Sequence, residues 1–321
     1  MSGRDAGVRK GGSIVSRRYL VGLFLGLPAW GACGPLAEHL PGRPVIDMHL
    51  HALTGDWTEG MDTTWYPTTL PRAANTDSLR ERSLRRLRES HVVKAVASGD
   101  HLEVIRKWHD AAPERIIPAL ELVQSTNVDT LRARLRKGDI QVLGEALWQY
   151  EGLLPSDPRL EPFWALAEEL DLPIGIHIGP GPVEVQRRSP YRTSLTDPLA
   201  MEEVLVRHPR LRVYIMHAGW PMLDRMVALM YSFPSLYVDI SLIDWYLPSG
   251  EFHAYLERLM NAGFGKRIMY GSDQMGWPDA IPRSIARIES ASFLTGDQKR
   301  NILCRNAARF LRLEAAVCSA W

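Results

Sequence analysis

Residues 169–178, ELDLPIGIHI, contain the transition from a helix to a strand that decides the fold. Pro173 ends the helical pattern, because its ring removes a backbone N–H and clashes with the preceding turn of a helix. The short apolar run that follows has the composition of a buried strand. A helix is therefore followed directly by a strand, and the polar His177 comes near the carboxyl end of that strand.

The same alternation of helix and strand recurs along the chain from residue 44 onward. Short apolar runs predict strands at 45–49, 92–97, 115–120, 140–146, 173–178, 211–216, 235–240 and 267–271. Periodic, charge-bearing segments predict helices at 77–90, 101–112, 128–137, 158–171, 197–208, 222–232, 250–263 and 279–290. This alternation predicts a parallel α/β protein. A doubly wound sheet is the alternative, but eight strands and a mature length close to the ~250 residues typical of the type favour a single-domain (β/α)8 TIM barrel.

Polar residues at the ends of these strands indicate where a site forms, because such barrels place their active sites at the carboxyl ends of the strands. The first strand lies in PVIDMHLHA, residues 44–52. Side chains two positions apart in a strand share a face, so Asp47, His49 and His51 project together. The fourth, fifth, sixth and eighth strands contribute Glu145, His177, His217 and Asp273. Asp239 of the seventh strand is a weaker candidate, and the second and third strands supply nothing comparable.

These strand ends carry the donor types that hold a divalent metal ion. Neutral imidazoles and carboxylates are ligands for zinc and similar ions. A single histidine of this kind is as often a hydrogen-bonded core residue as a ligand. Compatible donors at five strand ends of one barrel mouth favour a metal site, so we expect one or two divalent ions, with zinc as the expected metal.

The chain resembles the amidohydrolase superfamily, in the amidohydrolase-related branch called amidohydrolase family 2. The matching features are IDMHLH at the first strand, the histidines that end strands five and six, YGSDQ at strand eight and the closing ILCRNAARFLRL. The resemblance extends from Val45 to about Leu313. It implies that the metal ligands are His49, His51, Glu145, His177, His217 and Asp273.

The resemblance also implies an activity: a metal-dependent hydrolase that uses metal-activated water to cleave an amide, ester or lactone bond of a small substrate. Asp273 would be the general acid and base, and His217 would orient the substrate carbonyl or bind a second ion. A helix N-cap is the alternative role for Asp273. The alternative reaction is metal-dependent non-oxidative decarboxylation of an unsaturated or aromatic carboxylic acid. A non-catalytic binding protein is a third interpretation, which the complete ligand set disfavours.

Tryptophans in the loops after the expected strands are candidates for substrate binding. Tryptophan is large and can stack on planar ligands, and an arginine in the fifth loop could meet a carboxylate. We therefore expect substrate contacts from Trp57, Trp148, Arg192, Trp220 and Trp277. The alternative is that the tryptophans only cover the top of the barrel and that the arginine is solvated.

The first residues have the pattern of an export signal. A basic, Gly-rich beginning is followed by Arg17-Arg18 and an apolar run that is shorter than the about 20 residues of a membrane span. The arginine pair resembles a twin-arginine signal, and GAC ending at Cys33 resembles a lipoprotein cleavage site. We expect an exported protein, either periplasmic or anchored to the membrane through a lipidated Cys33. An N-terminal amphipathic helix is the alternative.

These patterns predict three regions: a signal peptide at 1–33, the metal-dependent barrel at 44–313 and a C-terminal tail at 314–321. Lys plus Arg is 38 against 37 Asp plus Glu, which gives no indication of a nucleic-acid surface. The expected partner is a small-molecule substrate, and a homo-oligomer is compatible with the sequence. Cys304 lies in an amphipathic helical segment, where a buried free thiol is the default.

Overall fold

A computed structural model describes residues 43–54, 68–183, 185–187 and 189–319. The chain divides into two units, Met1–His39 and Leu40–Trp321, and all described residues belong to the second. The expected signal peptide, with Cys33, lies outside the described residues. None of the described helices combines the length and the apolar character needed to cross a membrane.

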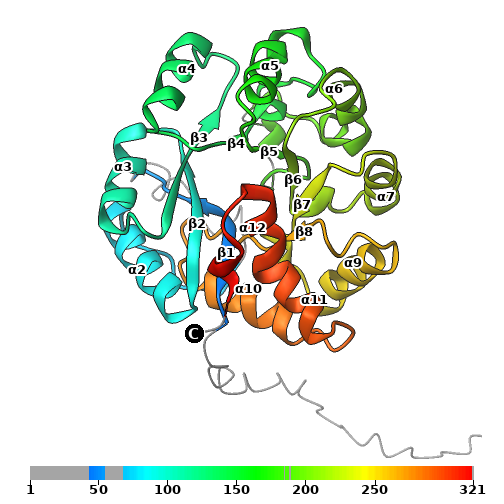
Figure 1. The fold of residues 1–321 in the computed structure, drawn as a ribbon. Helices are drawn as coiled ribbons and strands as arrows, with labels where there is room; N and C mark the ends of the chain where they lie inside the picture. Colours follow the sequence, from blue (N-terminus) through cyan, green and yellow to red (C-terminus); the bar gives the residue numbers. More distant parts are fainter. Residues whose placement is uncertain (1–42, 55–67, 184, 188, 320–321) are drawn as a thin grey trace, which may run out of the picture. The chain divides into compact units, whose positions relative to one another are not determined.

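Eight parallel strands form one sheet, in which each strand pairs with the next one along the chain. They are β1 (Val45–His51), β2 (Val92–Gly99), β3 (Ile116–Leu122), β4 (Val142–Ala146), β5 (Ile174–His177), β6 (Val213–Met216), β7 (Tyr237–Asp239) and β8 (Ile268–Met269). The sheet curls so that β8 approaches β1 (Figure 1). Met48 N–H donates to Tyr270 O at 3.0 Å, and Asp273 N–H donates to His49 O at 2.7 Å. These bonds join the two edges, which confirms the TIM barrel.

Helices surround the strands as an outer ring (Figure 1). Those that follow the eight strands are α2 (Thr76–Glu89), α3 (Leu102–Ala111), α4 (Val128–Lys137), α5 (Glu161–Glu169), α6 (Glu202–Arg207), α7 (Leu223–Ser232), α9 (Ser249–Asn261) and α10 (Ala280–Glu289). The others are α8 (Ile243–Tyr246), α11 (Gly296–Arg300) and α12 (Asn306–Leu311). Helix α6 is shorter than the predicted 197–208, because Pro198–Met201 forms a 3₁₀ turn before it.

Local sequence explains where several helices begin and end. Asn75 caps α2 by accepting a hydrogen bond from Ser78 N–H at 2.9 Å, which satisfies one of the donors left free in the first turn. Asn127 caps α4 in the same way, and Gly138 ends that helix in the left-handed conformation at φ 77°. These signals lie within a few residues of each boundary, which is why the sequence predicts the helices well.

The amino-terminal end of the barrel is filled by apolar side chains and closed by the last helix. Its buried cluster includes Ile46, Met48, Tyr214, Met216, Met269, Cys304 and Phe310. Helix α12 lies across the strands at this end, in front of them in Figure 1. The free thiol expected at Cys304 is wrong, because this residue forms a disulfide with Cys318. The disulfide ties the 3₁₀ turn Ala315–Cys318 to the helical segment Asn301–Arg305, which precedes α12.

Candidate metal centre

His49 and His51 at the end of β1 turn their Nε2 atoms toward each other, 3.2 Å apart. A register irregularity between Asp47 and Leu50 interrupts the alternation of the strand. The sequence predicted that Asp47 would project together with these histidines, and this prediction is wrong. Asp47 instead accepts hydrogen bonds from the backbone N–H groups of His49 and Ser272. Gln274 holds the strand end in place, since its side-chain amide donates to His51 O and accepts from His51 N–H, each at 2.8 Å.

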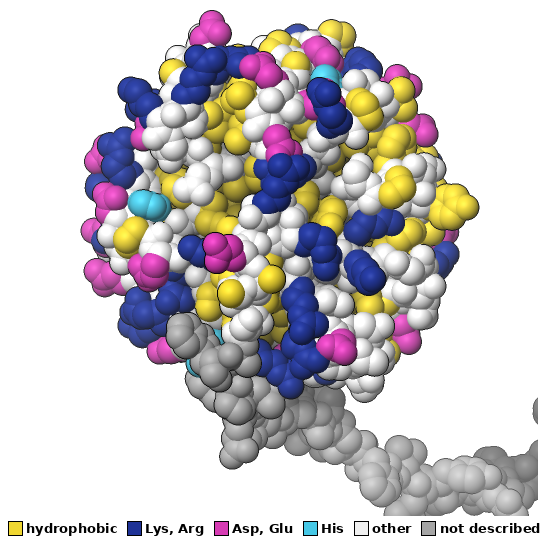
Figure 2. All heavy atoms as spheres, in the orientation of Figure 1, with side chains coloured by type: hydrophobic (Ala, Val, Ile, Leu, Met, Phe, Trp, Pro, Cys, Tyr) yellow, Lys and Arg dark blue, Asp and Glu magenta, His cyan; other side chains and the backbone are white. Residues whose placement is uncertain are grey.

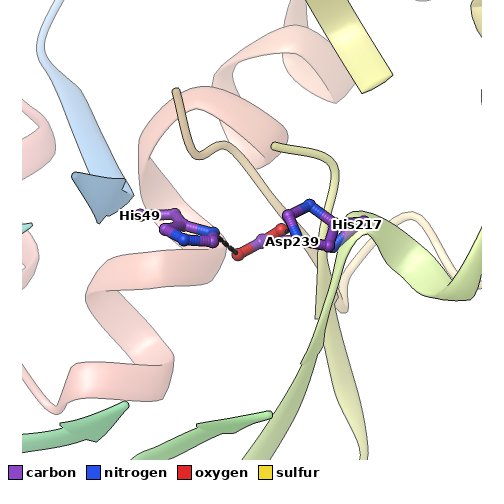
Figure 3. Close-up of side chains that lie close together, drawn as sticks. All are labelled: His49, His217 and Asp239. Carbon is purple, nitrogen blue, oxygen red and sulfur yellow. Dashed lines mark hydrogen bonds and ion pairs between the residues drawn. The ribbon is translucent and has the colours of Figure 1, made fainter. Parts of the chain in front are cut away.

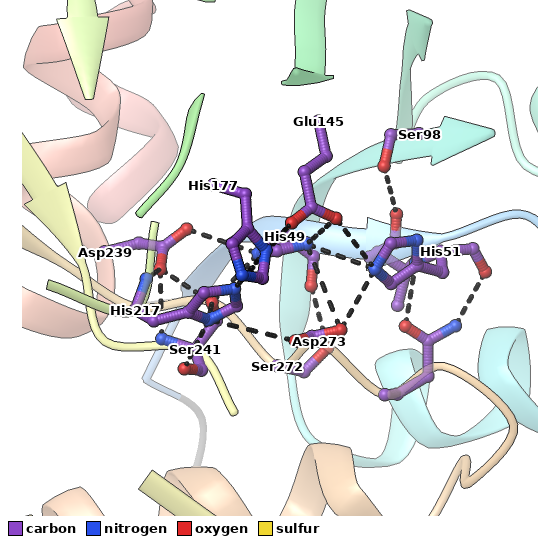
Figure 4. A network of polar contacts seen from close by, with 12 residues as sticks. His49, His51, Ser98, Glu145, His177, His217, Asp239, Ser241, Ser272 and Asp273 are labelled. Carbon is purple, nitrogen blue, oxygen red and sulfur yellow. Dashed lines mark hydrogen bonds and ion pairs between the residues drawn. The ribbon is translucent and has the colours of Figure 1, made fainter. Parts of the chain in front are cut away.

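Glu145 at the end of β4 lies between two pairs of histidines, with one oxygen toward each pair (Figure 4). Its Oε2 is 3.4 Å from His49 Nε2 and 3.5 Å from His51 Nε2. Its Oε1 is 2.5 Å from His177 Nδ1 and 3.7 Å from His217 Nε2. Two groups that could hold a metal ion therefore share this carboxylate: His49, His51 and Glu145 in one, and Glu145, His177 and His217 in the other.

Asp273 follows β8 and faces the two histidines of the first of these groups. Its Oδ1 is 3.0 Å from His51 Nε2 and 3.9 Å from His49 Nε2. The backbone of Asp273 has φ 44°, a left-handed conformation that costs a non-glycine residue about 1 kcal/mol or more. Gly271 lets this segment approach β1, because a Cβ there would come within 2.8 Å of His49 Cβ. The backbone is thus strained at Asp273, the residue that carries this carboxylate.

For three of the four histidines, acceptors outside the ligand set indicate which ring nitrogen carries hydrogen. Asp239 Oδ1 accepts the hydroxyl of Ser241 at 2.6 Å, so Ser241 Oγ can accept a hydrogen bond from His49 Nδ1 at 2.9 Å. His217 Nδ1 donates to Ser241 O at 3.1 Å, and His51 Nδ1 faces Glu121 Oε1 at 3.3 Å. In this arrangement the Nε2 lone pairs of these three histidines point inward, as metal ligands require.

Asp239 belongs to these acceptors outside the ligand set, although it also groups with His49 and His217 (Figure 3). Its Oδ1 accepts three hydrogen bonds, from His217 N–H, Ser241 N–H and Ser241 Oγ. Its Oδ2 lies 3.5 Å from His49 Nδ1, the nitrogen that faces away from His51. Asp239 therefore holds the backbone of His217 and faces the ring of His49 on the side away from His51.

The electrostatics of the cluster favour bound cations. Burial by itself would lower the pKa of His51, but hydrogen bonds to Asp273 and Glu121 outweigh it and raise this pKa to about 10. Burial likewise would raise the pKa of Glu145, but His177 and His49 hold it well below its usual range. The ionised carboxylates thus favour positive charge on the neighbouring imidazoles, and a metal ion could supply that charge in place of the protons.

A cavity of about 270 Å³ opens beside the cluster and is lined by His51, Glu145, His177 and Asp273 together with side chains of the surrounding loops. Its position at the carboxyl ends of the strands is where a TIM barrel binds its substrate. The structure therefore brings a possible ligand set and a substrate-sized space together in one barrel mouth.

The described tryptophans and the arginine that the sequence suggested for substrate binding lie outside the lining of this cavity. Trp148 is buried and packs against Phe163 and Trp164, with ring centroids 5.5 and 5.0 Å away. Trp220 donates to Glu251 at 3.2 Å, and Trp277 is buried in the core. Arg192 is exposed and donates to the carbonyl of Tyr191. None of these described residues lines the cavity, and Trp57 lies outside the described residues.

Sequence reasoning missed Glu121 and Tyr150. Strand β3 extends to Leu122, beyond the predicted end at residue 120, so this strand does contribute a polar residue to the mouth. Alternation along PALEL could have signalled that Glu121 faces the interior. Tyr150 lies 3.4 Å from His177 Nε2 through its hydroxyl, and its short 3₁₀ turn, Trp148–Glu151, gave no signal in the sequence.

The comparisons with known proteins agree with this architecture. No curated protein matches the sequence. An uncharacterized TIM-barrel protein from Bordetella bronchiseptica is 17% identical, with a TM-score of 0.65 over 84% of this chain and 98% of that one. A probable 2-pyrone-4,6-dicarboxylic acid hydrolase from Acinetobacter baumannii is 14% identical, with a TM-score of 0.60 over 84% and 99%. The 5-carboxyvanillate decarboxylase of Sphingomonas paucimobilis is 15% identical, with a TM-score of 0.57 over 85% and 100%.

At these identities the solved structures show a shared fold, and they include both a hydrolase and a decarboxylase. The model of the amidohydrolase family matches residues 46–313, which is almost the whole barrel. The chain therefore belongs to the amidohydrolase family, and this fold indicates an enzyme.

Proposed function

We propose that the protein is a metal-dependent hydrolase that cleaves an amide, ester or lactone bond of a small substrate with two divalent ions, zinc being the metal that suits the donors. The observation that carries the proposal is the position of Glu145, whose Oε1 faces His177 and whose Oε2 faces His49 and His51. A carboxylate that reaches two ligand groups could help to hold two ions, and two-ion sites occur in several classes of hydrolytic enzyme.

The residues present fit such ions. Asp273 Oδ1 is buried and faces His51 Nε2 at 3.0 Å, so an oxygen ligand is available next to His49 and His51. His217 and His177 supply the nitrogen ligands of the second group. Imidazole and carboxylate donors together are typical of zinc.

The roles of the side chains follow from their positions. Bound divalent ions supply a Lewis acid for the scissile carbonyl and lower the pKa of water to about 7. Asp273 lines the cavity, so its carboxylate can take a proton from the attacking water and pass it to the leaving group. His217 turns Nε2 toward Glu145 and His177, which favours a ligand role over direct contact with the substrate. Glu121 and Asp239 hold His51 and His49 in orientation.

Decarboxylation is the competing reaction. It breaks a carbon–carbon bond without an attacking water, so it needs neither a second ion nor a carboxylate that serves two ligand groups. The test is elemental analysis of protein purified without added metal, followed by a screen of esters, lactones, amides and aromatic acids. Turnover of an aromatic acid with release of carbon dioxide, and of no ester, lactone or amide, would contradict the proposal.

We also propose that the protein is exported. The disulfide between Cys304 and Cys318 supports this, because disulfides persist in oxidising compartments and are rare in the cytosol. Replacing Arg17 and Arg18 by lysine should then retain the protein in the cytoplasm. Mass spectrometry of the exported protein should find residues 1–32 removed, with a diacyl mass on Cys33 if this residue is lipidated. Exported protein with residues 1–32 intact would contradict a cleaved signal.

A further inference from the structure

The cavity beside the metal cluster combines apolar walls with acidic side chains. The apolar walls are Leu53, Val123, Leu147, Val185, Leu242 and Met275. Two carboxylates outside the proposed ligand set, Glu121 and Glu151, also line it. Among the described residues around this cavity, none is a lysine or an arginine. The part of a substrate that does not react therefore meets apolar surface and negative charge.

The two extra carboxylates differ in what they can do. Glu121 faces His51 Nδ1 at 3.3 Å and is occupied in orienting that ring. Glu151 is partly exposed at the end of the 3₁₀ turn that follows β4, and its Oε2 accepts a hydrogen bond from Gln124 N–H at 2.7 Å. That bond fixes the carboxylate in position without neutralising its charge. Glu151 is therefore a fixed anion on the cavity wall.

An aromatic ring precedes this anion in the same turn. Tyr150 lines the cavity, and its ring is stacked on that of Tyr191 with centroids 5.4 Å apart and planes 27° apart. The faces of tyrosine rings attract cations, and a desolvated cation gains the most. A rigid tyrosine next to a fixed carboxylate is an arrangement that suits an ammonium group.

A carboxylate on the substrate would be bound unfavourably in this cavity. It would be placed near Glu151 in a partly desolvated space where repulsion between like charges is stronger than in bulk water. A buried charge without a counter-charge is costly, and the described lining contains no lysine or arginine that could supply one. The cavity thus discriminates by charge as well as by shape.

We infer that the substrate carries a positively charged amine on an apolar body, which Glu151 and Tyr150 bind while the scissile bond lies at the metal cluster. This inference rests on the proposed function, because it takes the cavity to be the substrate site. Glu151 is then a specificity-determining residue and takes no part in the bond cleavage.

The test uses three hydroxamates that share a metal-binding group and an aromatic body: 4-aminomethyl-, 4-methyl- and 4-carboxybenzohydroxamic acid. Their affinities for the metal-loaded protein are measured by titration calorimetry, which does not depend on turnover. The aminomethyl compound should bind most tightly and the carboxy compound most weakly, with an overall difference of about a hundredfold, because the charge of the substituent reverses near a fixed anion. The variant Glu151→Gln keeps the acceptor for Gln124 and should reduce this difference about tenfold. Glu257→Gln, on an exposed face of α9, is the matched control and should leave it unchanged.

Each outcome decides a separate point. Equal or tighter binding of the carboxy compound by the wild type would overturn the inference, while the proposed function would stand. A charge preference that Glu151→Gln does not reduce would also overturn the assignment of Glu151. Failure of all three hydroxamates to bind would instead contradict the metal centre, and with it the proposed function.

Discussion

The two ends of the barrel are built from the same strands but from opposite chemistry. At the amino-terminal end, Ile46 and Met48 of β1 pack with Tyr214 and Met216 of β6 in an apolar cluster. At the carboxyl end, a few residues further along the same two strands, β1 presents His49 and His51 and β6 is followed by His217. One strand thus contributes to the core at one end and to the candidate site at the other.

The amino-terminal end therefore contributes mainly to stability, and the carboxyl end contributes the candidate site. Burial of apolar side chains stabilises the amino-terminal end, and its outer surface carries paired charges, such as Arg212 and Arg312 with Asp171. Figure 2, in the orientation of Figure 1, shows basic side chains spread among hydrophobic ones on this face. The carboxyl end buries carboxylates and imidazoles, which is costly unless cations compensate them. Substitutions at the amino-terminal end should therefore lower the free energy of unfolding, and substitutions at the carboxyl end should mainly reduce activity or metal affinity.

The largest effect on activity is expected from Asp273→Asn. The amide keeps the shape and an oxygen donor but removes the base, so kcat should fall about 100- to 10,000-fold, the range of general acid–base contributions. Circular dichroism and the free energy of unfolding should change little, because the core at the other end is untouched. Near-normal turnover in this variant would assign Asp273 to a structural role.

The opposite end is tested by removing the disulfide. Cys304 and Cys318 are 14 residues apart, and a loop of ~15 residues closed by a disulfide gains about 3 kcal/mol. The double variant Cys304→Ala, Cys318→Ala should lose about this much free energy of unfolding, measured with urea, while the metal-loaded protein keeps its kcat. Reductant should destabilise the wild type and leave the variant unchanged. A wild type that reductant does not destabilise would contradict a structural disulfide.

A smaller effect is expected from Glu121→Gln, because Glu121 acts on the metal through His51. Loss of such a partner weakens metal affinity by about 10- to 100-fold. Competition with a chromogenic chelator should show this loss, while the number of ions at saturation is unchanged. Glu257→Gln is again the control. An unchanged affinity in Glu121→Gln would show that His51 is held by other contacts.

The sequence predicts the barrel well because the relevant signals are local. Pro173, the caps at Asn75 and Asn127 and the apolar periodicity each lie within the element that they define. The histidines at strand ends are also visible, since a fold that aligns its strands brings their ends together. The structure keeps His49, His51 and Glu145 within one cluster, as expected.

The features that sequence analysis missed depend on distant contacts. Glu121 lies near His51 only because β3 extends two residues beyond its predicted end. The partner of Cys304 is set by the way in which the last turn folds back, which no local pattern records. Asp47 does not join the predicted cluster, because an irregularity in strand pairing between Asp47 and Leu50 interrupts the alternation of side chains.

The central claim is that Glu145 serves two ions, and counting ions tests it most directly. Elemental analysis at saturating zinc should find two ions per chain in the wild type. In Glu145→Gln, which keeps one oxygen donor but loses the charge shared by the two groups, it should find one ion and most activity should be lost. A second role for Glu145, orienting a single metal-bound histidine, predicts the same ion count in both proteins. One ion per chain in the wild type at saturating zinc would contradict the role of Glu145 in holding two ions. Decarboxylation would then be supported as well as hydrolysis.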